Sequence, residues 1–226
     1  WGRPESEVAE ILDDLYTSSV NPSLAFLASN SEIKIRVTAK AETTAGAWLL
    51  IEPMEMEVRS RLGDTVFGSD DETIERVLLQ LLSDRGYTVG TAESMTGGMV
   101  SARLTELPGS SAVVKGGLVA YDSELKQRLL GLADVTEVVT AEAALAMARG
   151  AQELLDVDVA VAVTGSAGPE PMEKPVGTVI VGVATPDDVR ARELRFSGDR
   201  ERLRTYGTAA ALHLTRLALI GRWWKE

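Results

Sequence analysis

The clearest candidate for chemistry is the segment 91–98, which reads Thr-Ala-Glu-Ser-Met-Thr-Gly-Gly. The apolar alternation over residues 87–92 predicts a strand, and the spacing over residues 99–104 predicts a helix. A hydroxyl at such a turn can present its oxygen to a ligand, and the first backbone N–H groups of the helix can bind a phosphate or a developing oxyanion there. The alternative is that Ser94 or Thr96 only caps the helix. Spacing alone favours the cap, because Ser and Thr are common capping residues.

Three further segments place polar side chains at predicted strand ends or helix starts. Their candidate residues are Tyr121 and Lys126, Thr164 and Gly165, and Arg200 and Arg204. Each segment has an ordinary interpretation as well: a solvated lysine, a flexible connector, and surface arginines that pair with neighbouring acids. Because ligands of helix-flanked sheets bind at strand ends, a common pocket is the functional hypothesis.

The residues that the chain lacks also limit its chemistry. It has no cysteine and a single histidine, His213. The absence of cysteine rules out a thiolate nucleophile and a Cys-ligated zinc site, and one histidine rules out a two-histidine site. We therefore expect neither a metal nor a cofactor. His213 lies beside Arg216, away from the small and apolar helix face, so we expect it at the surface, and a nucleophilic Ser94 would use Lys or Tyr as its base.

The composition indicates an ordinary soluble globular protein, with 45% hydrophobic and 25% charged residues. A net charge of −11 argues against a general nucleic-acid surface, which needs clustered Lys and Arg. No apolar run is long enough to cross a bilayer and no secretory signal is visible, so we expect a cytoplasmic protein without a membrane partner. Because the chain starts at Trp1, we also expect it to be a fragment.

The order of predicted elements indicates two domains. Residues 1–69 predict a small α+β unit in the order helix, strand, strand, helix, strand, with the last strand over residues 64–67. Residues 70–226 alternate between strands and helices, which predicts an α/β fold with a helix-flanked mixed sheet.

Taken together, the ordered motifs resemble the CinA family. The motifs lie at residues 91–98, 108–111, 116–131, 164–178 and 198–204. Residues 70–221 resemble the C-terminal nicotinamide-nucleotide amidase domain of that family, and residues 1–69 resemble its KH-like linker domain. The resemblance implies hydrolysis of the carboxamide of nicotinamide mononucleotide (NMN), which yields nicotinic acid mononucleotide and ammonia.

The resemblance also implies roles for individual residues. Ser94 would be the nucleophile, Lys126 the general base, and Tyr121 a proton relay or an orienter of the lysine. Burial or a neighbouring cation should lower the pKa of Lys126. The expected substrate-binding residues are Met95, Thr96, Gly97, Gly98, Thr164, Gly165, Arg200 and Arg204. Among these, the N–H groups near 95–97 would form the oxyanion hole, the arginines would hold the phosphate, and the Thr164 loop would border the ribose or the ring.

Two departures from the family pattern favour an alternative function. Ser123 and Ser166 stand where asparagine and isoleucine are usual, so the chain could be a catalytically silent nucleotide-binding or regulatory module.

The N-terminal unit lacks the Gly-x-x-Gly loop of RNA-binding KH domains, and we interpret it as a spacer or dimerisation module. We expect a homodimer or higher homo-oligomer, in which Trp223 and Trp224 cover a partner surface.

Overall fold

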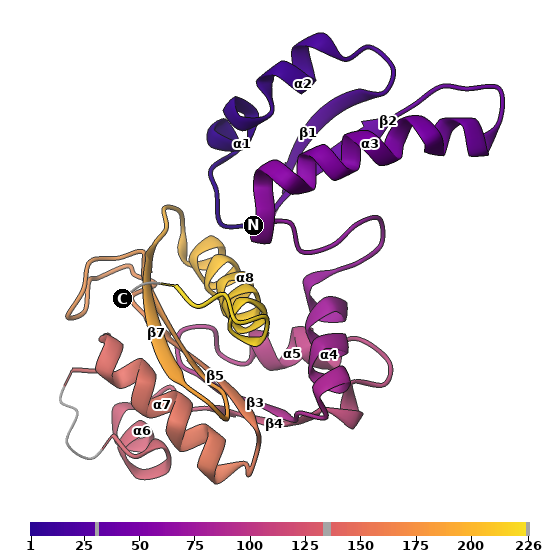
Figure 1. Ribbon diagram of the computed structural model, residues 1–226. Coiled ribbons are helices and arrows are strands. Elements are labelled where there is room, and N and C mark those ends of the chain that lie inside the picture. The colour runs from indigo at the N-terminus through magenta and orange to yellow at the C-terminus, as the bar shows by residue number, and fades with distance from the viewer. Residues whose placement is uncertain (30–31, 133–136, 225–226) are drawn as a thin grey trace. The chain divides into compact units, whose positions relative to one another are not determined.

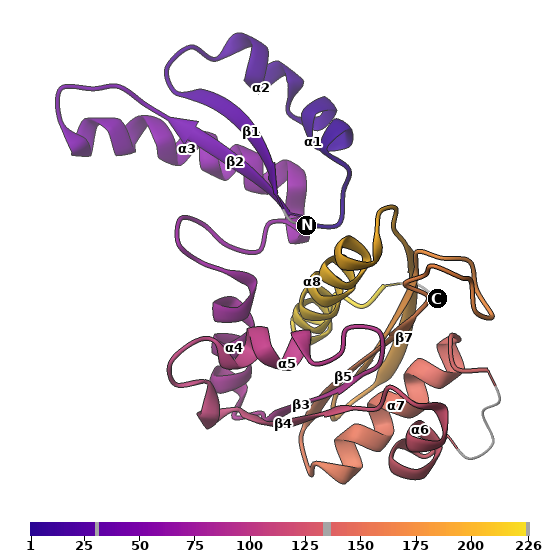
Figure 2. The ribbon, with the colours of Figure 1, turned by 180° about the vertical axis from the view of Figure 1, so that it is seen from behind.

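A computed structural model describes residues 1–29, 32–132 and 137–224 of the chain. The contacts among these residues divide the chain into two compact units, Trp1–Phe67 and Gly68–Glu226 (Figures 1 and 2). The break falls in the connection between the last helical turn of the first unit and the first helix of the second.

The first unit packs helices on an antiparallel hairpin. Its elements are α1 (Glu5–Ile11), α2 (Asp13–Ser18), β1 (Ser23–Ser29), β2 (Glu32–Thr38), α3 (Thr44–Leu62) and a 3-10 helix (Gly63–Thr65). Its core is aliphatic and is formed by Val8, Leu12, Leu24, Met54, Val58 and Leu62. The strand expected over 64–67 is wrong, because this backbone bonds locally: Val66 N–H donates to the Gly63 carbonyl at 3.1 Å.

The second unit is built on a five-stranded sheet in the order β4-β3-β5-β6-β7. The strands are β3 (Val89–Glu93), β4 (Val114–Val119), β5 (Val159–Gly165), β6 (Thr178–Ala184) and β7 (Val189–Arg195). β3 pairs in parallel with both β4 and β5, whereas β6 pairs antiparallel with both β5 and β7. The sheet is therefore mixed, as the sequence predicts.

Helices cover both faces of this sheet (Figures 1 and 2). One face carries α4 (Ile74–Arg85), α5 (Met99–Thr105) and α8 (Arg200–Leu219), and the other carries α6 (Ser123–Leu130) and α7 (Ala141–Leu154). The strands β3, β5 and β6 are buried at every position. Double coverage explains why these strands are rich in Val and Ala instead of alternating cleanly with polar residues. The helix-flanked α/β prediction is confirmed.

Helix α8 is buried on more than one side. It packs on β5 and β6 and also on α4 and α5, and His213 has 0% exposure. The expected surface position of His213 is therefore wrong, because the polar-looking face of α8 is covered by neighbouring helices.

The chain end after α8 covers the edge of the sheet. Trp224 is buried, and its indole N–H donates to the Ala191 carbonyl of β7 at 2.8 Å. This tryptophan therefore packs within its own chain, where a partner surface was expected.

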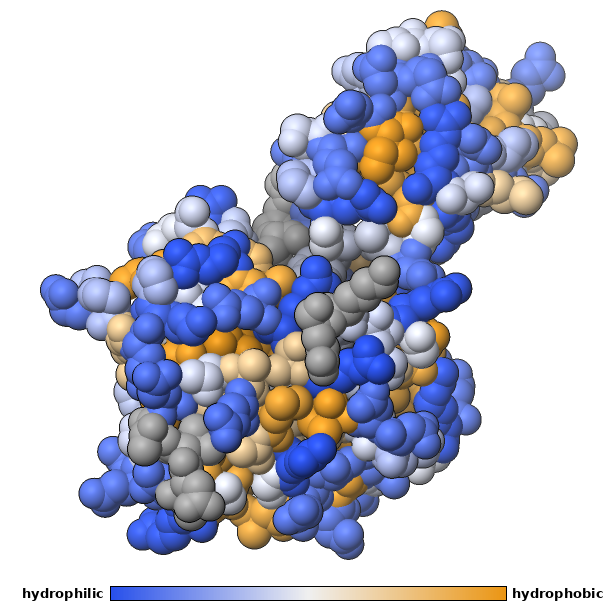
Figure 3. Space-filling model, turned by 60° about the vertical axis from the view of Figure 1, so that its left-hand side comes forward, coloured by the Kyte–Doolittle hydropathy of each residue, from blue (hydrophilic) through white to orange (hydrophobic). Residues whose placement is uncertain are grey.

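The visible surface is largely hydrophilic, with smaller hydrophobic groups between (Figure 3). In the described part of the chain, no helix is both long and apolar enough to cross a bilayer.

Candidate active site

Ser94 directly follows β3 and lies where three parallel strands end. Its backbone N–H donates to the Val163 carbonyl of β5 at 2.9 Å. On the other side, the Ala120 N–H donates to the Glu93 carbonyl at 2.9 Å. These bonds place Ser94 at the carboxyl edge of the sheet between the ends of β4 and β5, where the residue is 9% exposed. Ligands of α/β folds bind at this edge.

The side chain of Glu93 caps helix α5. Its carboxylate accepts the backbone N–H groups of Gly98, Val100 and Ser101 at 2.9, 3.0 and 2.8 Å, and it also accepts the Ser101 hydroxyl at 2.8 Å. These are the donors that the start of a helix leaves free. The helix N–H groups that the sequence offered to a ligand are therefore occupied by a carboxylate of the chain itself.

The interpretation of Ser94 or Thr96 as the helix cap is wrong. The capping position of α5 is Gly98, which has no side chain to donate or accept a bond. In the described part of the chain, the Thr96 hydroxyl is buried without a hydrogen-bond partner, and no bond involves the Ser94 hydroxyl. Ser94 is thus left free for chemistry.

Two backbone donors that directly follow Ser94 remain unused among the described residues. The Ser94 carbonyl accepts the Gly97 N–H at 3.1 Å, which closes a turn. Arg204 donates Nε to the Met95 carbonyl at 3.0 Å and Nη2 to the Thr96 carbonyl at 2.9 Å. Within the described ranges, the N–H groups of Met95 and Thr96 have no acceptor. The Gly97 N–H, which was expected in the oxyanion hole, is occupied, as is that of Gly98.

Lys126 lies at the same edge of the sheet in a buried position. Asp122 caps α6 by accepting the Leu125 N–H at 3.1 Å, which starts the helix one turn before the lysine. Lys126 is 2% exposed, and its Nζ donates to the Tyr121 carbonyl at 3.0 Å. Burial lowers the pKa of Lys126 below its ordinary value of 10.5, while the carboxylates of Asp122 and Glu173 oppose that shift.

Tyr121 is placed differently from its expected role. Its backbone carbonyl contacts Lys126, whereas its phenol oxygen accepts Nη2 of Arg200 at 2.7 Å. Arg200 also donates Nη1 to the Gly168 carbonyl at 2.9 Å, and both the arginine and the tyrosine are exposed. Arg200 therefore joins the end of β4 to the loop after β5.

Thr164 and Gly165 lie at the end of β5, beside the turn that begins at Ser94. The Thr164 hydroxyl donates to the Val138 carbonyl at 2.6 Å and is buried. A Cβ on Gly165 would lie 2.5 Å from Met95 Sδ and 2.4 Å from the Thr178 carbonyl oxygen, so only glycine lets the turn pack this closely. Ser166, the next residue, is 1% exposed, and its hydroxyl has no partner among the described residues.

Sequence reasoning missed the polar network beneath the turn. The hydroxyls of Thr91 and Ser101 lie 2.6 Å apart, and Ser101 also bonds to Glu93. A Cβ on Gly117 of β4 would lie 2.2 Å from Ser101 Oγ and 2.3 Å from Thr91 Oγ1. The available signal was Glu93 itself, an acid at the end of an apolar strand that leads directly to a helix start.

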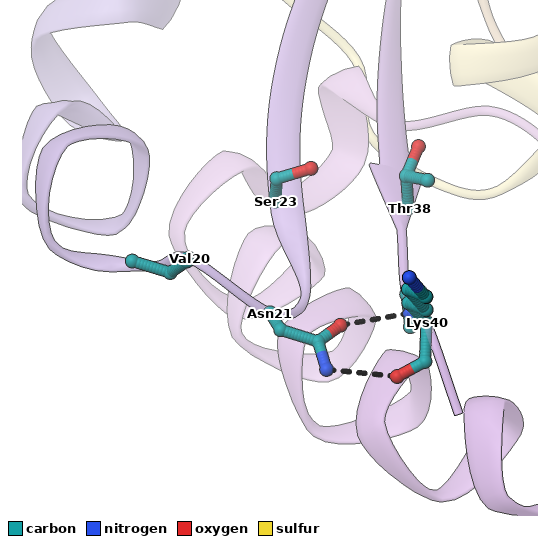
Figure 4. A pocket seen from close by; sticks show the side chains of 6 residues that line it. Val20, Asn21, Ser23, Thr38 and Lys40 are labelled. Carbon is teal, nitrogen blue, oxygen red and sulfur yellow. Dashed lines mark hydrogen bonds between the residues drawn. The ribbon is translucent and has the colours of Figure 1, made fainter. Parts of the chain in front are cut away.

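Among the described residues, no three His, Cys, Asp or Glu side chains gather as metal ligands would. The first unit has a hollow of about 350 Å³, lined by Val20, Asn21, Ser23, Thr38, Ala39 and Lys40 (Figure 4). Its amide group is already used, because the side chain of Asn21 accepts the Lys40 N–H at 2.8 Å and donates to the Lys40 carbonyl at 2.9 Å. These two hydrogen bonds join the segment before β1 to the segment after β2, at the open end of the hairpin.

Known families match almost the whole chain. The damage-inducible protein CinA KH domain matches residues 1–68, and the CinA C-terminal domain matches residues 71–219. The chain belongs to the CinA family. A CinA-like protein from Frankia casuarinae is 43% identical over 228 residues, which cover 97% of this chain and 53% of that protein. Another CinA-like protein, from Dictyoglomus turgidum, is 39% identical over 97% of this chain and 55% of its own length. This CinA-family chain therefore spans about half the length of those relatives.

Solved structures of competence or damage-inducible proteins share the fold of about two thirds of this chain. The competence/damage-inducible protein from Agrobacterium tumefaciens is 37% identical with a TM-score of 0.62, over 69% of this chain and 98% of that one. The competence damage-inducible protein A from Klebsiella pneumoniae is 28% identical with a TM-score of 0.61, over 68% of this chain and 100% of that one. These names specify no reaction.

Proposed function

We propose that the second unit is an amidase that hydrolyses the carboxamide of NMN to nicotinic acid mononucleotide and ammonia. One observation carries the proposal. Among the described residues, the Ser94 hydroxyl has no hydrogen-bond partner and is followed by two unused backbone N–H groups, at the sheet edge that also holds the buried Lys126 amine. A nucleophile, an oxyanion site and a base are the parts that acyl transfer requires.

The first half of the reaction forms an ester. The Lys126 amine in its neutral form takes the hydroxyl proton as Ser94 Oγ attacks the carboxamide carbon. The oxygen of the tetrahedral intermediate accepts hydrogen bonds from the N–H groups of Met95 and Thr96. When the C–N bond breaks, the Lys126 ammonium gives its proton to the leaving nitrogen, and ammonia departs.

The second half releases the acid. Water attacks the ester carbon while Lys126 takes a proton from it, and the same N–H pair again stabilises the oxyanion. Collapse breaks the bond to Oγ, which recovers its proton from Lys126, and nicotinic acid mononucleotide leaves. The burial that lowers the pKa of Lys126 supports this role, because it raises the fraction of neutral amine.

Arg200 is our candidate for the substrate phosphate. It lies at the start of α8, is exposed, and contacts only a phenol oxygen and a loop carbonyl among the described residues. An incoming phosphate would offer it charge-assisted, bidentate bonds, which are stronger than those neutral contacts.

A second candidate function is nucleotide binding without hydrolysis. It is favoured by the hydrogen bond of Lys126, whose amine donates to the Tyr121 carbonyl instead of contacting Ser94. This alternative predicts that NMN binds and stays intact.

Ammonia release separates the two functions. Purified chain incubated with NMN without added metal should release ammonia, and Ser94→Ala should lower the rate by about 1,000-fold or more, because the nucleophile is gone. Ser83→Ala, in helix α4, is the control for handling and folding. Binding of NMN by the wild-type chain without ammonia would favour the silent module.

A further inference from the structure

Arg204 faces the backbone of the Ser94 turn, not the solvent side of the site. Its Nε and Nη2 donate to the carbonyls of Met95 and Thr96 at 3.0 and 2.9 Å. The guanidinium lies directly against the chain: a Cβ on Gly97, whose φ is +61°, would be 3.1 Å from Nη2. Arg204 therefore already has two acceptors, placed side by side as its planar fork requires.

These contacts determine where the unused N–H groups point. In a trans peptide, the carbonyl of one residue and the N–H of the next point in opposite directions within one plane. Holding the Met95 carbonyl on Arg204 therefore turns the Thr96 N–H away from the guanidinium. The bond from Gly97 N–H to the Ser94 carbonyl fixes the Met95 N–H in the same manner. Both donors follow Ser94 directly in the chain.

The charge on Arg204 also strengthens the Thr96 donor. A cation at the carbonyl end of a peptide group polarises it, and hydrogen bonds in such chains reinforce one another. Two side chains hold the turn. The Glu93 carboxylate accepts N–H groups at the start of the helix, and the Arg204 guanidinium donates to the carbonyls of the turn. In the part of the chain that the structure describes, this arrangement leaves the N–H groups of Met95 and Thr96 without an acceptor.

We propose that Arg204 is a positioning residue that orients and polarises the oxyanion-binding N–H of Thr96, and that it does not bind the substrate phosphate. The inference rests on the proposed amidase function and replaces the phosphate role that the sequence suggests for this arginine. Arg200, one helical turn earlier and exposed, is left as the phosphate ligand.

The test compares Arg204→Met with Arg200→Met on two substrates, NMN and the phosphate-free nicotinamide riboside. Removing an oxyanion donor lowers kcat by about 100- to 1,000-fold, so loosening one should lower it by about 10- to 100-fold. We expect Arg204→Met to lower kcat by a similar factor on both substrates, with little change in KM for NMN. Arg204→Lys should recover part of kcat, since it can still contact one carbonyl. Arg200→Met should instead raise KM for NMN and leave the riboside unaffected.

The opposite pattern would overturn the inference. If Arg204→Met raises KM for NMN, keeps kcat and leaves riboside hydrolysis unchanged, Arg204 is a phosphate ligand. Absence of ammonia from the wild-type chain on both substrates would instead refute the amidase function.

Hydrogen exchange tests the positioning role without turnover. Exchange of the amides over residues 94–98 should become faster in Arg204→Met and stay unchanged in Arg200→Met. Unchanged exchange in Arg204→Met would reject the positioning role, whatever the activity.

Discussion

Glu93 is the residue on which the geometry of the candidate site depends most directly. The Glu93 carboxylate accepts four bonds from the N-cap and first turn of α5, whereas an amide in the same place would point an NH₂ group at other donors. We predict that Glu93→Gln destabilises the second unit by about 3 kcal/mol, since bonds to a charged group are worth about 1.5–3 kcal/mol each. Urea unfolding measures this, with the exposed Glu124→Gln as the control. Equal stability of the two variants would contradict the capping role.

Lys126 should control how activity depends on pH. Only the neutral amine can take the Ser94 proton, and burial lowers the pKa of this lysine below 10.5. We predict that kcat/KM rises about tenfold per pH unit on the acid side and levels off once pH exceeds the lowered pKa. The variant Lys126→Gln should lose this limb together with most of the activity. The exposed Lys115→Gln should keep the wild-type profile, and a lysine-independent profile would exclude Lys126 as the base.

At the level of elements, strand β4 must approach α5 closely beneath the turn. A Cβ on Gly117 would meet two hydroxyl oxygens at 2.2 and 2.3 Å, whereas one on Gly116 would have a single neighbour at 3.9 Å. We predict that Gly117→Ala lowers the unfolding free energy by about 2–3 kcal/mol and also reduces activity, because overpacking displaces Ser101 and Thr91. Gly116→Ala should stay within about 1 kcal/mol of the wild type. Thermal unfolding of this matched pair checks the prediction, which fails if both behave alike.

Elements were easier to predict than the contacts between them. Periodicity predicted a strand over residues 87–92 and a helix over residues 99–104, and the structure has β3 at Val89–Glu93 and α5 at Met99–Thr105. Periodicity placed His213 on the surface, because it cannot show that a second layer of helices covers α8. The roles of Glu93 and Arg204 depend on side chains that reach backbone groups elsewhere in the fold. Those distances arise only when the strands and α8 are assembled.

At the scale of the whole molecule, the proposed chemistry belongs to one unit. Every contact that carries the site lies within Gly68–Glu226, and solved CinA chains are covered at 98–100% by about two thirds of this chain. We predict that residues 68–226 expressed alone fold and retain at least half of the ammonia release of the full chain. Circular dichroism and the ammonia assay check this. A folded but inactive fragment would mean that the first unit contributes to the site.

A search for the ester on Ser94 tests the proposed nucleophile most directly. The reaction is quenched with acid during NMN turnover, the chain is digested, and the masses of its peptides are measured by mass spectrometry. We predict a peptide containing Ser94 that carries the nicotinic acid mononucleotide acyl group, and no such adduct in Ser94→Ala. Full turnover by Ser94→Ala, or an adduct on another residue, would exclude Ser94 as the nucleophile.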